Sequence, residues 1–125
     1  MNENQLSNQI IGLAIKVHKT LGPGLYENVY KDCLFYELSN SGLLVEKEKP
    51  VSVTYENHVL DCSFRMDLFV EKKVVLEIKS VEEITRIHMT QLLTYLKFSQ
   101  AKLGLLMNFN VALLSQGIKR VVLNL

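Results

Sequence analysis

The apolar residues of this chain follow two different periods, and the change between them near Gly42 limits the folds that the chain can adopt. Over residues 6–21 they recur at helical spacing, and Gly22-Pro23-Gly24 then interrupts the pattern. A second helical stretch runs from about Leu25 to the helix-ending sequence Ser39-Asn40-Ser41-Gly42. Two helices are therefore predicted to precede any strand.

The second predicted helix carries Val29, Cys33 and Tyr36 on one side, which we interpret as its apolar face. Glu27 and Tyr30 are three positions apart and share a side of the same helix. An acid in the first turns of a helix is also explained by the helix dipole. Glu27 alone therefore indicates no function.

Beyond the second helix the apolar residues alternate, as in strands that have one buried face. Apolar residues alternate over 51–55 and again over 60–70, on either side of a predicted turn at Glu56-Asn57-His58. This pattern predicts an antiparallel meander. After the polar break Glu71-Lys72-Lys73, the segment 74–79 is rich in β-branched residues and predicts a short strand.

The last third of the chain predicts a helix from about Glu83 to Ser99 and a buried strand over 102–108. A strand, a helix and a strand in this order favour a parallel pair. Residues 118–125 are expected to add an edge strand, and 111–116 are compatible with the start of a short helix. The pattern as a whole predicts an α/β fold, of the α+β kind with a mixed sheet.

Length and charge set limits on function. With 125 residues the chain is too short for two ordinary domains, so residues 1–125 are expected to form one. A net charge of +1 gives no general attraction for polyanions, so nucleic-acid contact would need a local basic cluster. No signal-peptide pattern, membrane-spanning apolar run or CxxC spacing occurs. We expect a cytoplasmic protein without membrane contact.

The hairpin around Lys72 has one register that keeps its apolar face continuous. A turn symmetric about Lys72 sets apolar residues opposite one another: Val70 and Val74, Leu68 and Leu76, Met66 and Ile78. The same register places Asp67 opposite Glu77, and Arg65 opposite Lys79. A shift by one residue would mix the two faces of the sheet.

Two facing carboxylates are destabilising unless a positive charge lies between them. A hard divalent cation would supply that charge, and Mg²⁺ accepts a site with only one or two carboxylates. Lys79 shares a face with Glu77, so its ammonium would reach the same place. A solvated sheet face with ion pairs among these residues is the ordinary alternative, and it stays open at this point.

The third predicted helix places Gln91 and Tyr95 four positions apart on one face, together with His88. A core-facing tyrosine with a polar neighbour is the simpler explanation when these residues are taken singly. The three histidines lie far apart and none belongs to an HExxH motif, so zinc has little support.

Three motifs in order resemble a known family. Gly24-Leu25-Tyr26-Glu27-Asn28-Val29-Tyr30 resembles the signature of the GxxExxY family of the PD-(D/E)XK nuclease superfamily. Asp67 with Glu77-Ile78-Lys79 is similar to the acidic residue and (D/E)xK element of that superfamily. Gln91-Leu92-Leu93-Thr94-Tyr95 is similar to the QxxxY element of its RecB-like branch. The resemblance runs from about Leu6 to the C-terminus.

The resemblance implies a restriction-endonuclease-like core, in which a central mixed sheet is flanked by helices. It also implies Mg²⁺, with Mn²⁺ as a substitute, held by Asp67 and Glu77 and approached by Glu27. Lys79 would be the catalytic lysine, and the side chains that position the site or touch the nucleic-acid backbone would be Gln91 and Tyr95. Met66 stands where the superfamily's name places proline, which is not a ligand.

The leading hypothesis is a Mg²⁺-dependent nuclease that hydrolyses DNA phosphodiesters with a water activated near the metal. The alternative is a catalytically silent module of the same fold that binds nucleic acid or a protein partner. A third hypothesis is an interaction domain with a charged sheet face. A homodimer is expected, because small nucleases often need a second copy to hold a duplex.

Overall fold

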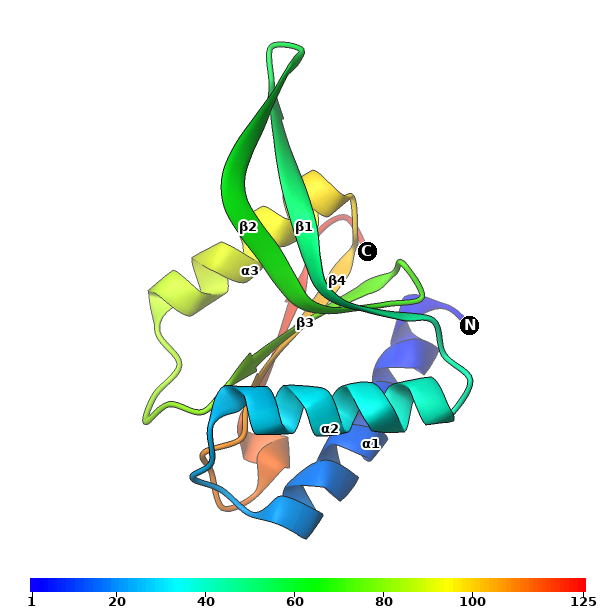
Figure 1. Cartoon of the computed structure of the whole chain (residues 1–125), viewed down its shortest axis with the longest axis vertical. Coiled ribbons are helices and arrows are strands. Elements are labelled where there is room, and N and C mark those ends of the chain that lie inside the picture. The colour runs from blue at the N-terminus through cyan, green and yellow to red at the C-terminus, as the bar shows by residue number, and fades with distance from the viewer.

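The computed structural model describes residues 1–125 as three α-helices, one 3-10 helix and five strands (Figure 1). In chain order these are α1 (Glu3–Leu21), α2 (Glu27–Asn40), β1 (Val45–Tyr55), β2 (His58–Val70), β3 (Val74–Lys79), α3 (Arg86–Ser99), β4 (Leu103–Asn108), η1 (Leu114–Gln116) and β5 (Ile118–Val122). None of the helices is both long enough and apolar enough to cross a bilayer.

The five strands form one mixed sheet in the order β1-β2-β3-β4-β5. The pair β3 and β4 is parallel, and the other neighbours are antiparallel. The α+β fold and the parallel pair predicted from the sequence are therefore confirmed. Helices α1 and α2 cover one face of the sheet, and α3 covers the other.

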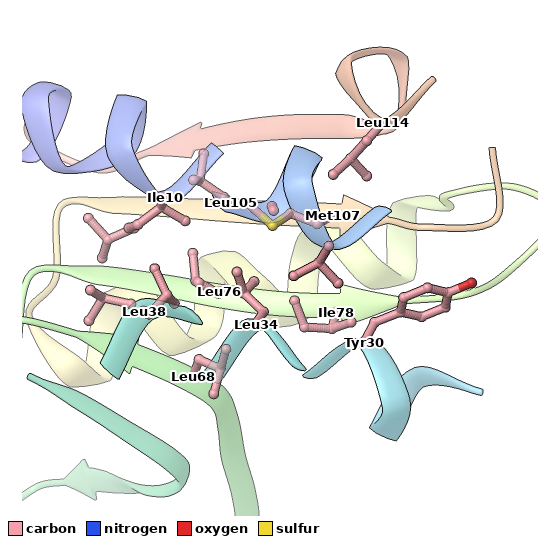
Figure 2. Packing of buried hydrophobic residues seen from close by; sticks show 14 of the residues in the cluster. Ile10, Tyr30, Leu34, Leu38, Leu68, Leu76, Ile78, Leu105, Met107 and Leu114 are labelled. Carbon is pink, nitrogen blue, oxygen red and sulfur yellow. The ribbon is translucent and has the colours of Figure 1, made fainter. Parts of the chain in front are cut away.

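The larger core lies between the sheet and the pair α1 and α2 (Figure 2). Alternate residues of β3 and β4 point into it, among them Leu76, Ile78 and Leu105, where they meet Ile10 and Leu34 from the helices. The intervening residues of β3 and β4 face α3, so both strands are buried on both sides. This explains their nearly continuous apolar sequence.

The predicted apolar face of α2 is wrong. Val29 and Tyr36 are 40% and 63% exposed, and the residues that α2 buries are Tyr30, Leu34 and Leu38. Because α2 carries apolar residues on both sides, the helical period alone did not identify the side that meets the sheet.

Strand β2 changes its orientation next to the predicted site. The register about Lys72 is confirmed at Leu68 and Leu76, but the ladder between β2 and β3 ends there. Met66 was expected opposite Ile78, and it instead packs in the second core against α3. Glu48 of β1 has a φ of 53°, and the register of β1 and β2 shifts farther along, between Val51 and Val53.

Past this point β1 and β2 leave the sheet as a hairpin that projects from the rest of the fold (Figure 1). No residue from Ser52 to Ser63 is buried. The hairpin is thus a two-stranded arm beyond the point where the pairing of β2 with β3 ends.

Candidate functional site

The two predicted metal ligands, Asp67 and Glu77, lie just beyond the point where the pairing of β2 with β3 ends. The backbone N–H of Ile78 donates to Oδ2 of Asp67 at 2.8 Å, where a strand ladder would otherwise continue. The register predicted that Asp67 pairs with Glu77 in the ladder, and the structure does not contain this pair. The side chain of Asp67 instead lies against the backbone of β3. The Asp67 carboxylate is close enough to Glu77 to raise the pKa of that acid.

Glu77 lies in an unusual environment for an acid. The residue is 3% exposed, and its Oε1 has no hydrogen-bond partner. Burial is the main cause that raises the pKa of Glu77 to about 10, and charge repulsion by the adjacent Asp67 and a side-chain hydrogen bond with it contribute to the same rise. With a pKa of about 10, this carboxyl group is protonated at neutral pH.

Lys79 is the nearest cation to this acid along the chain. Alternation along β3 puts Lys79 on the same side as Glu77, and its charge lowers the pKa of that acid, against the stronger effects of burial and Asp67. Lys79 is half-buried and takes part in none of the four ion pairs in the structure. Its ammonium is therefore not engaged by another carboxylate.

Glu27 lies at the end of β3 rather than beside Glu77. Its Oε2 accepts a hydrogen bond of 3.0 Å from the backbone N–H of Ser80. No three His, Cys, Asp or Glu side chains are grouped so that they could hold a metal ion. The expected gathering of Glu27, Asp67 and Glu77 into one group is thus absent from the structure, and a metal contact of Glu27 stays a prediction.

Tyr30 holds the segment that leads into α2. Its hydroxyl donates to the carbonyl of Gly22 at 2.6 Å and accepts from the N–H of Leu25 at 3.1 Å. Its ring stacks on Phe109 with a centroid distance of 4.5 Å. The sequence pattern indicates no role for Tyr30 beyond the side of α2 that it shares with Glu27. These contacts fix the first turn of α2, where Glu27 is located.

Asn108 was missed by the sequence analysis. Its buried side chain donates to the carbonyl of Val81 at 2.9 Å and accepts from the N–H groups of Val81 and Asn110, both at 3.1 Å. These hydrogen bonds of Asn108 fix the position of the loop that follows Lys79. The available signal was a single amide residue at the end of an otherwise apolar buried strand.

Tyr95 of α3 is buried in the second core together with Met66 and Val75, which lie near Asp67 and Glu77 in β2 and β3. Burial raises its pKa to about 12, with the charges of Glu77 and Asp67 acting in the same direction. Its phenol therefore stays protonated at neutral pH. Gln91, one turn earlier on α3, lines a pocket together with Tyr95 and Phe64. The structure thus places Tyr95 on the side of the sheet that carries Glu77, and Gln91 in the pocket that Tyr95 also lines.

A profile of the PD-(D/E)XK nuclease superfamily matches residues 4–121, which is nearly the whole chain. The chain belongs to the PD-(D/E)XK nuclease superfamily. Membership in this superfamily supports nuclease activity and a nucleic-acid substrate. Neither the search of curated proteins nor that of solved structures found a match.

PD-(D/E)XK nucleases typically use divalent metals, and the residues present here fit such an ion. Asp67 and Glu77 offer hard oxygen donors, and Oε1 of Glu77 is buried without a partner. A cation would satisfy this oxygen and offset the repulsion that raises the pKa of Glu77. Two carboxylates are enough for Mg²⁺, which keeps several of its waters.

Proposed function

We propose that this PD-(D/E)XK protein is a Mg²⁺-dependent nuclease that hydrolyses phosphodiester bonds in DNA, with Mn²⁺ as a substitute. The observation that carries the proposal is the buried, unpartnered Oε1 of Glu77 next to Asp67. A buried acid without a hydrogen-bond partner lowers the stability of the fold. Acids with such strongly shifted pKa values are concentrated at functional sites. Lys79 takes part in no ion pair and lies on the same side of β3 as Glu77.

In this proposal Asp67 and Glu77 would hold the cation, which would supply positive charge near the phosphodiester and make a bound water easier to deprotonate. The ammonium of Lys79 orients the attacking water and offsets the charge that develops on the phosphate. The protonated phenol of Tyr95 donates a hydrogen bond at the same place, and the Gln91 amide contacts the strand beside it. Glu27, held by Ser80, approaches the site from α2.

The finer assignments follow from the motifs. We assign the chain to the GxxExxY family and to the RecB-like branch, and we propose that residues 1–125 act as one catalytic domain in the cytoplasm. A homodimer also stays a prediction, which light scattering of the purified protein tests directly.

One observation favours the catalytically silent alternative. Glu27 bonds to the Ser80 backbone, and no third acid joins Asp67 and Glu77. A protein that binds nucleic acid or a protein partner without cutting would need no third ligand. Both functions use the same fold, so an activity assay must separate them.

The assay compares supercoiled plasmid, linear duplex and single-stranded DNA with Mg²⁺ or Mn²⁺. Lys79→Ala and Asp67→Asn should each lower the cleavage rate by about 10²- to 10⁴-fold, the range for general acid–base groups. Asn keeps an acceptor for the Ile78 N–H, so loss of folding is avoided. Lys119→Ala and Asp61→Ala, which change exposed residues on β5 and β2, are the matched controls.

Cleavage that survives both site substitutions would mean another site or a contaminating nuclease. No cleavage of any substrate by the wild-type protein would favour the silent alternative. Mn²⁺ binding, measured by electron paramagnetic resonance, then shows whether Asp67 and Glu77 hold a metal at all, because it should be lost in Asp67→Asn and kept in Asp61→Ala.

A further inference from the structure

A pocket of about 360 Å³ lies between the first half of α3 and strand β2. Its lining includes two aromatic rings, Phe64 and Tyr95, and the α3 residues Arg86, Ile87, Thr90 and Gln91. Tyr95 also packs in the second core together with Met66 of β2, the neighbour of Asp67, and Val75 of β3, two residues before Glu77. The pocket therefore lies on the side of the sheet that carries Glu77.

The charge of this pocket differs from that of its counterparts. Four other pockets each include at least one acidic residue, namely Glu37, Asp61, Glu27 and Glu3 in turn. The pocket beside α3 includes no acid, and Arg86 is its one charged residue. An anionic ligand is thus attracted here more than at the other four.

The lining combines apolar surface with a few polar groups. The rings of Phe64 and Tyr95 meet edge to face, with centroids 5.7 Å apart. Ile87 is 78% exposed at the rim, although it is a large apolar residue. The Gln91 amide offers both a donor and an acceptor. Tyr95 is only 3% exposed, so the aromatic surface open to a ligand is that of the half-buried Phe64. One ring, an amide and one guanidinium suit a nucleobase with its phosphate.

We propose that this pocket binds an unpaired nucleobase of the substrate strand, next to the phosphodiester that the acid pair receives. The inference rests on the proposed nuclease function and names its substrate class, a strand that is single-stranded at this position. A paired base is stacked inside the duplex and would have to leave the stack to enter the pocket. The phosphate of the bound nucleotide faces Arg86.

Binding is tested without cleavage, in EDTA, by fluorescence anisotropy of a labelled oligothymidylate of about 12 nucleotides. Ile87→Glu places a negative charge at the rim of the pocket without changing a buried residue. It should weaken binding of the single strand at least about five-fold, which is the weak end of base–aromatic stacking. Leu93→Glu is the matched control, because Leu93 is 44% exposed on the same helix and outside the pocket.

A second arm tests the base itself. An oligonucleotide with a series of abasic positions should bind the wild-type protein more weakly than the intact oligonucleotide does. The two oligonucleotides should bind Ile87→Glu with equal affinity. The complementary duplex should bind with little difference between Ile87→Glu and Leu93→Glu. Equal loss in both variants, or no effect of abasic positions, would overturn the proposal, since the contact would then be with phosphates alone.

The two proposals can fail separately. Single-strand binding that depends on Ile87, in a protein that cuts no DNA, would keep the nucleobase pocket and reject the nuclease function. Metal-dependent cleavage that is unchanged in Ile87→Glu on single-stranded DNA would keep the nuclease function and reject the pocket. Capture of a peptide in place of the oligonucleotide would also reject it.

Discussion

At the scale of single residues, the position of Glu77 is unfavourable without a counter-charge. Its carboxyl group is buried, faces Asp67 and keeps one oxygen without a partner. The apolar neighbours in β3 follow the ordinary pattern of a central strand, so the acid is the exception in that strand. Such exceptions are expected where function competes with stability.

The raised pKa of Glu77 predicts the direction of a stability change with pH. The folded protein retains a proton up to about pH 10, whereas the unfolded chain releases it near the ordinary value of 4.5. The folded state therefore holds more protons between these values, and the free energy of unfolding should fall as pH rises through this window. Between pH of about 6 and about 8 we expect a loss of about 1 to 3 kcal/mol in EDTA.

Urea unfolding at several pH values measures this loss. Glu77→Gln should remove most of the slope, whereas Glu82→Gln, which changes an exposed acid, should leave it unchanged. Added Mn²⁺ should reverse the loss, because a cation binds the deprotonated form. A slope that is the same in Glu77→Gln would contradict the assignment.

At the scale of elements, the close packing of α3 on the sheet depends on Gly104 in β4. A Cβ atom at this position would lie 2.7 Å from Cδ1 and 2.9 Å from Cγ of Leu92 on α3. Only the absence of a side chain lets the helix lie this close to the sheet. Since Tyr95 is on the same helix, one turn beyond Leu92, the close approach also sets the position of Tyr95 in the second core.

Gly104→Ala should therefore lower the free energy of unfolding by about 1 to 3 kcal/mol, the usual range for overpacking. Leu92→Ala should lower it by about 2 to 5 kcal/mol through the cavity that it leaves. The double variant should lose less than the sum, because the smaller residue makes room for the added methyl group. Urea unfolding measures all three.

Gly12→Ala is the matched control for that comparison. Gly12 lies in α1, where an added Cβ meets no atom within 4 Å, so the change should stabilise the helix by up to about 1 kcal/mol. Strict additivity of Gly104→Ala and Leu92→Ala would show that the two positions do not compete for space.

At the scale of the whole molecule, the projecting part of the β1 and β2 hairpin has no core of its own. Residues from Ser52 to Ser63 are exposed or half-exposed, and Tyr55 and Val59 present large apolar side chains to solvent. A two-stranded ribbon without a packed face is marginally stable. The arm is thus the part of the fold that opens most easily.

Hydrogen exchange followed by NMR or mass spectrometry should show this difference. Amides between Val53 and Leu60 should exchange through local opening of low free energy, whereas those of β3 and β4 should exchange only on global unfolding. Protection of the arm equal to that of β3 would contradict the expectation. It would also indicate that a second copy covers the arm, which the predicted homodimer allows.

Local sequence patterns determined the order of the elements, the parallel pair of β3 and β4, and the register around Lys72. These features depend on periods of two or 3.6 residues and on turns, which neighbouring residues encode. The motif residues Asp67, Glu77 and Lys79 were found for the same reason, because adjacent strands bring them together.

Only the tertiary structure decided which side of α2 is buried, where Met66 packs and how Asp67 meets β3. It also placed Glu27 on the Ser80 backbone and Asn108 on the loop after β3. Each of these depends on contacts between segments far apart in the chain, or on the point where the pairing of β2 with β3 ends. Such contacts leave no periodic trace in the sequence, because they are selected by packing of the whole fold.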